Sequence, residues 1–222
     1  MHNQGPSMRS PFTLSAIFAA LAVCSGATHA NLLVNGSFEA LDASAAPYYV
    51  RSFASTPGWT QYADGVDLIH NNYEQPSLPV LVDASDGVQF LDMNQGGAIG
   101  GLFQVVGASA GVAYTLQLDI TAWATNSVPG SVGYQLYDPV SNAVLAQGSL
   151  TDAVADNSWA TVSLTATALS GSIGVNIYGI SAHQAGMGVD NVVLSAVPEP
   201  GNWALLLAGA GLLQLQLRRQ RR

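Results

Sequence analysis

The feature that most constrains this fold is the alternation of apolar and polar residues between Tyr114 and Trp123. Apolar side chains occupy every second position from Tyr114 to Ile120, and polar side chains lie between them. Successive side chains of a β-strand point to opposite faces, so the segment predicts a strand with one buried face and one solvated face. Strands of this kind are typical of antiparallel sheets. We therefore expect an antiparallel sheet packed on a core.

Similar short segments recur along the chain, and turn residues such as Asn35-Gly36, Pro57-Gly58 and Asp138-Pro139 separate them. Helix patterns are scarce. The sequence therefore predicts an all-β fold, a jelly-roll β-sandwich of short strands. The expected strands span residues 31–34, 59–62, 66–70, 88–93, 99–106, 114–123, 132–137, 143–150, 159–165, 173–177 and 189–194.

The two ends of the chain differ from this body. Residues 1–30 contain Arg9, an apolar run from Phe12 to Val23 and small residues before Asn31, which is the pattern of a secretory signal peptide. The only cysteine, Cys24, lies within it, so the body has no thiol for a disulfide or for cysteine catalysis. We expect three parts: the signal peptide 1–30, a β-sandwich domain 31–196 and a C-terminal tail 197–222.

The charge of the body argues against nucleic acid and anionic membranes as partners. Residues 31–196 contain one basic residue, Arg51, against 13 acidic residues, which gives a net charge of −12 with histidine neutral. Such a body repels nucleic acid and anionic membranes. The acidity suits contact with divalent cations, and it also suits plain solubility outside the cell.

The tail has three parts in a fixed order: a short proline motif, an apolar run from Trp203 to Leu217 and a cluster of arginines. An arginine cluster crosses a bilayer only at high cost, so it is expected to stay on the cytoplasmic side as a membrane-stop cluster. The apolar run has 15 residues and contains two glutamines, whereas a full span needs about 20 apolar residues. We therefore expect a transmembrane helix that serves as a temporary anchor. The motif is Pro198, Glu199 and Pro200, and the cluster is Arg218, Arg219, Arg221 and Arg222.

These three parts together resemble a PEP-CTERM sorting signal, which is found on exported proteins of Gram-negative bacteria that make exopolysaccharide. The resemblance implies recognition by an exosortase and removal of the tail at or near Pro198-Glu199-Pro200. It also implies a transient stay in the inner membrane, followed by release to the cell surface or extracellular matrix.

The body carries a second resemblance, to the galactose-binding-like jelly roll that many carbohydrate-binding modules share. The resemblance implies a non-catalytic domain associated with glycans. The segments that carry it are Asn31–Glu39, Gly87–Leu91, Phe103-Gln104, Tyr114 after Gly111, and Gly188–Val192.

This second resemblance also implies a structural Ca²⁺ where the first and last strands meet. Glu39 and Asp190 fall at the matching positions, and carboxylates are the hard oxygen ligands that Ca²⁺ prefers. The alternative is that both side chains cap turns or face solvent.

Sugar binding would use aromatic platforms, for which Trp59, Tyr62 and Trp123 are the candidates, with Tyr73 as a further one. Trp123 shares the polar face of its strand, which favours exposure. Trp59 follows a Pro-Gly turn and fits a core position better. For every one of these rings, packing in the core is the competing interpretation.

Enzyme patterns are weak. His70 and His183 lack metal-ligand spacing, and no serine lies in a nucleophile elbow. We therefore expect a non-enzymatic cell-surface or matrix protein that is associated with extracellular polysaccharide. Two alternatives remain: a purely structural matrix protein, and a carbohydrate-active enzyme that uses Asp64 with Asp67 or Asp83 with Asp86 as paired acids.

Overall fold

A computed structural model describes most of the predicted body and parts of the tail. Contacts between backbone atoms divide the chain into Met1–Ala30 and Asn31–Arg222, and the fold below belongs to the second unit. The described residues are 30–47, 50–52, 57–63, 66–73, 82–93, 99–122, 130–152, 158–180, 187–198, 209–211, 213–214 and 216–220.

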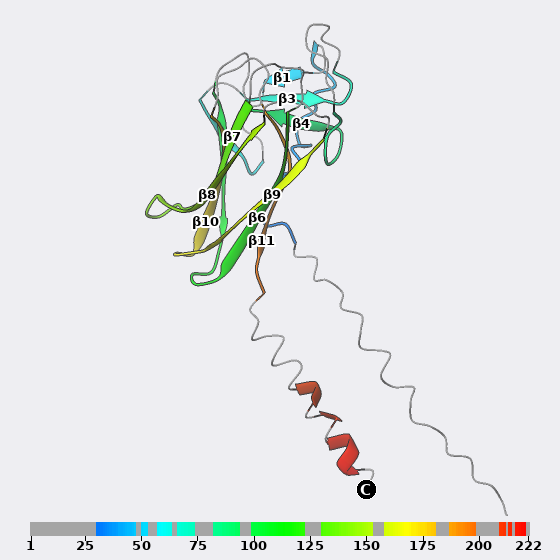
Figure 1. The fold of residues 1–222 in the computed structure, drawn as a ribbon, viewed down its shortest axis with the longest axis vertical. Coiled ribbons are helices and arrows are strands. Elements are labelled where there is room, and N and C mark those ends of the chain that lie inside the picture. Colours follow the sequence, from blue (N-terminus) through cyan, green and yellow to red (C-terminus); the bar gives the residue numbers. More distant parts are fainter. Residues whose placement is uncertain are drawn as a thin grey trace, which may run out of the picture. The chain divides into compact units, whose positions relative to one another are not determined.

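The body is a sandwich of two antiparallel sheets (Figure 1), which confirms the predicted all-β fold class. The first sheet has the strand order β1-β3-β4-β11-β6-β9, and the second has the order β2-β5-β10-β7-β8. The strands of the first sheet are β1 Val50–Ser52, β3 Asp67–His70, β4 Gln89–Asp92, β11 Met187–Ala196, β6 Ala113–Ala122 and β9 Ala160–Thr167. Those of the second are β2 Thr60–Tyr62, β5 Gly101–Gly107, β10 Ser172–Gly179, β7 Gly130–Asp138 and β8 Ala143–Asp152.

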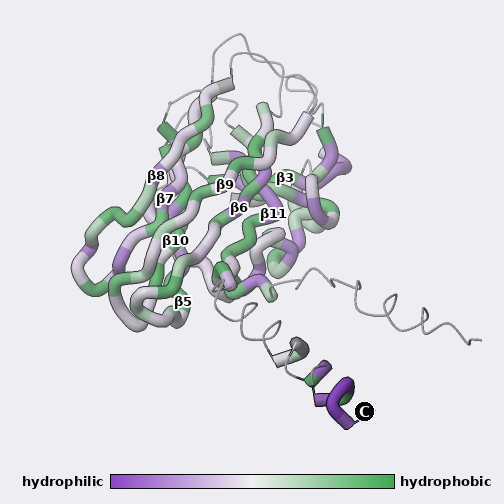
Figure 2. The backbone as a smooth tube through the Cα atoms, turned by 60° about the horizontal axis from the view of Figure 1, so that its bottom comes forward, coloured by the Kyte–Doolittle hydropathy of each residue, from purple (hydrophilic) through white to green (hydrophobic). Residues whose placement is uncertain are grey.

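The hydrophobic core lies between the two sheets, and the alternation within each strand places it there. On β6, Leu116, Leu118 and Ile120 are buried, while Gln117 on the opposite face is exposed. The alternation is visible as green and pale segments along the long strands in Figure 2. Ile173, Val175 and Ile177 of β10 and Val132 and Leu136 of β7 bury the facing side of the second sheet.

One strand was not predicted and one predicted strand does not form, each for a local reason. The three-residue strand β1, which pairs with β3, is too short to show an alternation in the sequence. Residues 31–34, predicted as a strand, follow β11 without forming one. The Asn31 side chain takes part in this contact: its Nδ2 donates to the Val192 carbonyl at 2.8 Å, and its Oδ1 accepts from the Leu194 amide at 3.0 Å.

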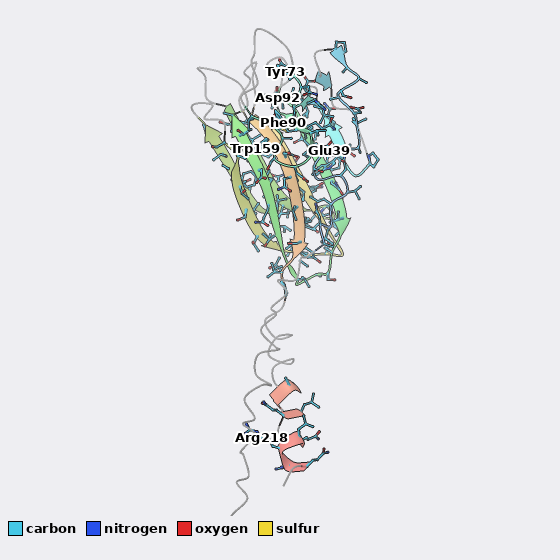
Figure 3. All side chains as sticks on the ribbon, turned by 90° about the vertical axis from the view of Figure 1, so that its right-hand side faces the viewer. Glu39, Tyr73, Phe90, Asp92, Trp159 and Arg218 are labelled. Atoms are coloured by element: carbon cyan, nitrogen blue, oxygen red, sulfur yellow. The ribbon has the colours of Figure 1, made fainter. Side chains whose placement is uncertain are left out.

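Little of the predicted terminal segments falls within the described residues. Val197 and Pro198 are exposed directly after β11, and Arg218 and Arg219 are exposed on the helical residues 216–220, where Figure 3 labels Arg218. Among the described helical residues, none forms a helix with the length and apolarity that a membrane crossing requires. Residues 1–29, most of the apolar run, Glu199, Pro200, Arg221 and Arg222 lie outside the described residues.

Candidate functional site

A groove lies on the outer face of the five-stranded sheet, on the side away from the core. It holds about 300 Å³ and is open to solvent. Strands β2, β5, β7 and β10 and the turn between β7 and β8 contribute its walls and floor. The lining side chains are Tyr62, Phe103, Gln135, Tyr137, Asn142 and Asn176.

The strand register brings these side chains together from distant parts of the sequence. Asn176 lies opposite Phe103 on one side and opposite Gln135 on the other, so one row crosses three strands. Residues paired across antiparallel strands project from the same face. The neighbouring rows contribute Tyr62, which pairs with a glycine of β5, and Tyr137, which pairs with a glycine of β10.

Those two glycines determine how the tyrosine rings lie. A Cβ atom at Gly101 would be 2.3 Å from the Tyr62 ring, and one at Gly174 would be 2.2 Å from the Tyr137 ring. Each ring therefore leans across the adjacent strand into space that any other residue would fill. The groove consequently presents ring faces supported from below by the sheet.

Amide and hydroxyl groups complete the groove. The Tyr62 hydroxyl donates to Asn176 Oδ1 at 2.9 Å. Asn142 has a φ of 57°, a left-handed conformation that asparagine tolerates and that forms the tight turn between β7 and β8. Burial raises the pKa of the Tyr62 and Tyr137 hydroxyls, so both remain neutral hydrogen-bonding groups at physiological pH.

The structure separates the three predicted aromatic platforms. Tyr62 lines the groove and is 41% exposed. Trp59 is only 1% exposed, lies 5.5 Å from the Phe38 ring and donates its indole N–H to the Asn35 carbonyl at 2.8 Å. Trp59 is thus a core residue, which corrects its prediction as a platform. Trp123 lies outside the described residues.

The other five lining residues were not predicted from the sequence, among them Phe103, Tyr137 and Asn176. All three occupy outward positions of predicted strands, on the face opposite the core residues. The sequence does show aromatic residues and glycines at outward positions of these strands. They indicate a groove only once the strand register shows which glycine lies beside which ring.

A second feature joins the two carboxylates that were predicted to bind Ca²⁺. Both accept hydrogen bonds from one turn that precedes β4. The Asp86 amide donates to Asp190 Oδ2 at 2.8 Å, and the Val88 amide donates to Glu39 Oε1 at 2.9 Å. Gly87 lies between these donors with a φ of 79° and leaves room for the Glu39 carboxylate. The structure therefore brings Glu39 and Asp190 to the same turn.

Asp190 is fully buried, and desolvation raises its pKa to about 7, although backbone N–H donors at Asp86 and Asn191 act in the opposite direction. A cation beside it would favour the ionised form. Oxygen donors of this kind fit Ca²⁺. Among the described residues, no group of three or more Asp, Glu, His or Cys side chains could hold a metal, so backbone carbonyl oxygens would have to complete such a site.

Asp119 of β6 connects this turn to the sheet, a role that was not predicted from the sequence. It pairs across the sheet with Asp190. It accepts hydrogen bonds from the Ser85 hydroxyl, from Thr161 Oγ1 at 2.6 Å and from Asn191 Nδ2 at 3.0 Å. Ser85 belongs to the turn, Thr161 to β9 and Asn191 to β11, so the buried Asp119 carboxylate connects the turn to both strands.

Of the acids considered for hydrolysis, Asp83 and Asp86 lie in or just before this turn, and Asp67 lies on β3 opposite Asp92 of β4. The Asp83 carbonyl accepts the Trp159 indole N–H at 2.8 Å, and the Asp86 amide binds Asp190. Asp64 is outside the described residues. Trp159 stacks edge-on against Phe90 at 5.6 Å, and Figure 3 shows this pair near Tyr73 and Asp92.

Three solved structures are similar to this chain at low sequence identity. An arabinose-bound MgGH51 α-L-arabinofuranosidase has a TM-score of 0.50 and 19% identity, over 78% of this chain and 27% of that one. Tailspike protein 4 of bacteriophage CBA120 has a TM-score of 0.47 and 17% identity, over 75% of this chain and 21% of that one. TmCBM61 in complex with β-1,4-galactotriose has a TM-score of 0.48 and 18% identity, over 74% of this chain and 97% of that one.

This chain thus spans about a quarter of the arabinofuranosidase and about a fifth of the tailspike protein. The likeness to the arabinofuranosidase shows a shared fold. No curated protein matches the sequence.

A family model described as HpiC1-like, HpiC1 cyclase, matches residues 30–195, which is nearly the whole predicted body. The family is named for a cyclase, and this finding contradicts the expectation that the protein is not an enzyme. The match also shows that the sandwich, rather than either end of the chain, carries the family's features. The chain belongs to the HpiC1-like cyclase family.

Proposed function

We propose that the groove on the five-stranded sheet binds carbohydrate and that the protein acts on or associates with extracellular polysaccharide through it. The observation that carries this proposal is the pair of tyrosine rings that lie over Gly101 and Gly174 beside amide side chains. Sugar rings have apolar C–H faces and polar edges, so they need flat aromatic surfaces next to hydrogen-bonding groups.

The groove supplies both kinds of contact in one place. Tyr62, Phe103 and Tyr137 offer ring surfaces, and Gln135 and Asn176 offer amides that donate and accept hydrogen bonds. Because the rings are supported by the sheet, a ligand orders few side chains when it binds, which favours affinity. A preformed groove of this kind supports sugar recognition better than the buried Trp59 could.

The test is glycan binding by variants that remove one ring. Tyr137→Ala is expected to weaken binding about tenfold, because the loss of an aromatic contact costs roughly 1–1.5 kcal/mol. Isothermal titration calorimetry with the best glycan from an array measures the change. The matched control is Tyr73→Ala, because Tyr73, the further aromatic candidate, packs partly buried against Ile69 and Phe90 of the other sheet and does not line the groove. Equal affinities for Tyr137→Ala and Tyr73→Ala would contradict the proposal.

The family name favours a second function, which is ring closure of a ligand held in the same groove. Tyr62 and Tyr137 would donate hydrogen bonds to the ligand there, since their raised pKa keeps both hydroxyls protonated. Ring closure without loss of atoms gives a product of unchanged mass. Liquid chromatography with mass spectrometry on cell extracts tests for a new isomer that forms with the protein and is absent with Tyr62→Phe.

We further propose that the protein leaves the cytoplasm through its signal peptide and is sorted by an exosortase to the cell surface or matrix. The order of the tail's parts supports this: a proline motif, an apolar run and an arginine cluster. Exposure of Pro198 immediately after β11 also agrees with access by a processing enzyme.

We also propose a structural Ca²⁺ held by Glu39 and Asp190. The support is their convergence on the turn before β4 and the full burial of the Asp190 carboxylate, whose pKa desolvation raises to about 7. Such an ion would tie the segment before the first strand to the last strand, β11, and so stabilise both ends of the body.

A further inference from the structure

The lining of the groove is electrically neutral. None of its six side chains carries a formal charge, and both of its tyrosines remain protonated. The body has a single basic residue, Arg51, and that residue lies on β1, at the edge of the other sheet. Among the described residues that line the groove, none offers a cationic side chain to an anionic ligand.

The rest of the body adds an unfavourable field. Residues 31–196 hold 13 acidic residues against that one arginine. A carboxylate that approaches such a body meets repulsion at long range, and it loses hydration on entering the groove. Hydroxyl groups meet no such repulsion, and the amides of Gln135 and Asn176 can replace the hydrogen bonds to water that they lose.

We propose that the groove selects uncharged sugars and rejects anionic glycans, such as polymers of uronic acids with the same linkage. This inference rests on the proposed carbohydrate binding. The ligand class is then a neutral polysaccharide. Its specificity comes from contacts with the neutral sugar and also from the weaker affinity for the charged competitor.

Matched pairs of oligosaccharides test the inference on the full chain. The probes are β-1,4-linked oligoglucose with oligoglucuronate, oligogalactose with oligogalacturonate, and oligomannose with oligomannuronate. Titration calorimetry is done with EDTA present, so that no divalent cation bridges a carboxylate to the protein. Where the neutral oligosaccharide of a pair binds, we expect its acidic counterpart to bind at least about tenfold more weakly. Added salt is expected to reduce this difference in affinity, because it screens the repulsion between charges.

The outcomes separate the two proposals. Equal or tighter binding of the acidic member overturns the inference and leaves carbohydrate binding intact. Binding to no member of any pair, across this panel and a broad glycan array, overturns the proposed function, and the inference with it.

A charge placed in the groove gives a second readout. Gln135→Lys is expected to shift the ratio of acidic to neutral binding towards the acidic sugar by at least about tenfold. The matched control is Gln117→Lys, which makes the same change at an exposed position of β6 on the other sheet. If both variants shift the ratio equally, the overall field and not the groove sets the preference, and the assignment to the groove fails.

Discussion

At the scale of single residues, glycines determine how the groove's tyrosines lie. Gly174 has no Cβ, and the space is taken by the Tyr137 ring. The clash that a new methyl group would make is with the far end of a side chain that can rotate away. A substitution there should therefore move the ring more than it disturbs the fold.

The Gly174→Ala variant tests this arrangement. We expect glycan affinity to fall at least severalfold, because Tyr137 is displaced from the floor of the groove, while the free energy of unfolding changes by no more than about 1–2 kcal/mol. Calorimetry measures the affinity and urea unfolding measures the stability. Gly107→Ala on β5 is the control, since nothing lies within 4 Å of its added Cβ. Unchanged affinity for Gly174→Ala would refute the supporting role of this glycine.

At the scale of elements, the strands could be predicted and their pairing could not. On β10, the buried residues Ile173, Val175 and Ile177 alternate with outward-facing residues, so the sequence alone identified the buried face. Which strand lies beside β10 depends on contacts between residues far apart in the chain, which periodicity does not encode. The groove is a product of that pairing, and only Tyr62 of its lining was predicted.

The contact between β11 and the turn before β4 predicts a pH dependence. Burial raises the Asp190 pKa from its usual value to about 7, so the protonated form favours the folded state. In EDTA, the contribution of Asp190 to the free energy of unfolding should therefore be largest below about pH 4. It should fall by at most roughly 4 kcal/mol as the pH rises to about 7.

Two additions sharpen this measurement. Asp190→Asn should remove that contribution, because its side chain does not titrate. Calcium should raise the melting temperature of the natural protein near pH 7 and leave that of Asp190→Asn unchanged. A melting temperature that does not respond to calcium in either protein would rule out the Ca²⁺ site at Glu39 and Asp190.

At the scale of the whole molecule, the chain combines a sandwich with two terminal segments whose sequence patterns differ from it. The sandwich matches a cyclase-named family over residues 30–195. The sequence allowed the fold class to be predicted because alternation is a local property. The expectation that the protein is not an enzyme rested on the lack of short motifs such as a nucleophile elbow or a metal site, and the match to a cyclase-named family contradicts it.

Deletion of Pro198–Pro200 tests the proposed sorting. In the native host, we expect the deleted form to keep its tail and to remain in the inner membrane, while the natural protein loses its tail and reaches the surface. Cell fractionation, with antibodies against the body and against the tail, measures both the location of each protein and the presence of its tail. Pro139→Ala in a turn of the body is the control for proline loss. Equal retention and equal tail lengths in all three proteins would contradict exosortase sorting.

The central claim is that a carbohydrate occupies the groove between Tyr62 and Tyr137. A crystal structure of the protein with the tightest-binding neutral oligosaccharide tests it most directly. We predict electron density for a sugar ring stacked on one of these tyrosines, with hydroxyl groups within hydrogen-bond distance of Gln135 or Asn176. Density for the sugar at another surface, with this groove filled only by water, would contradict the account.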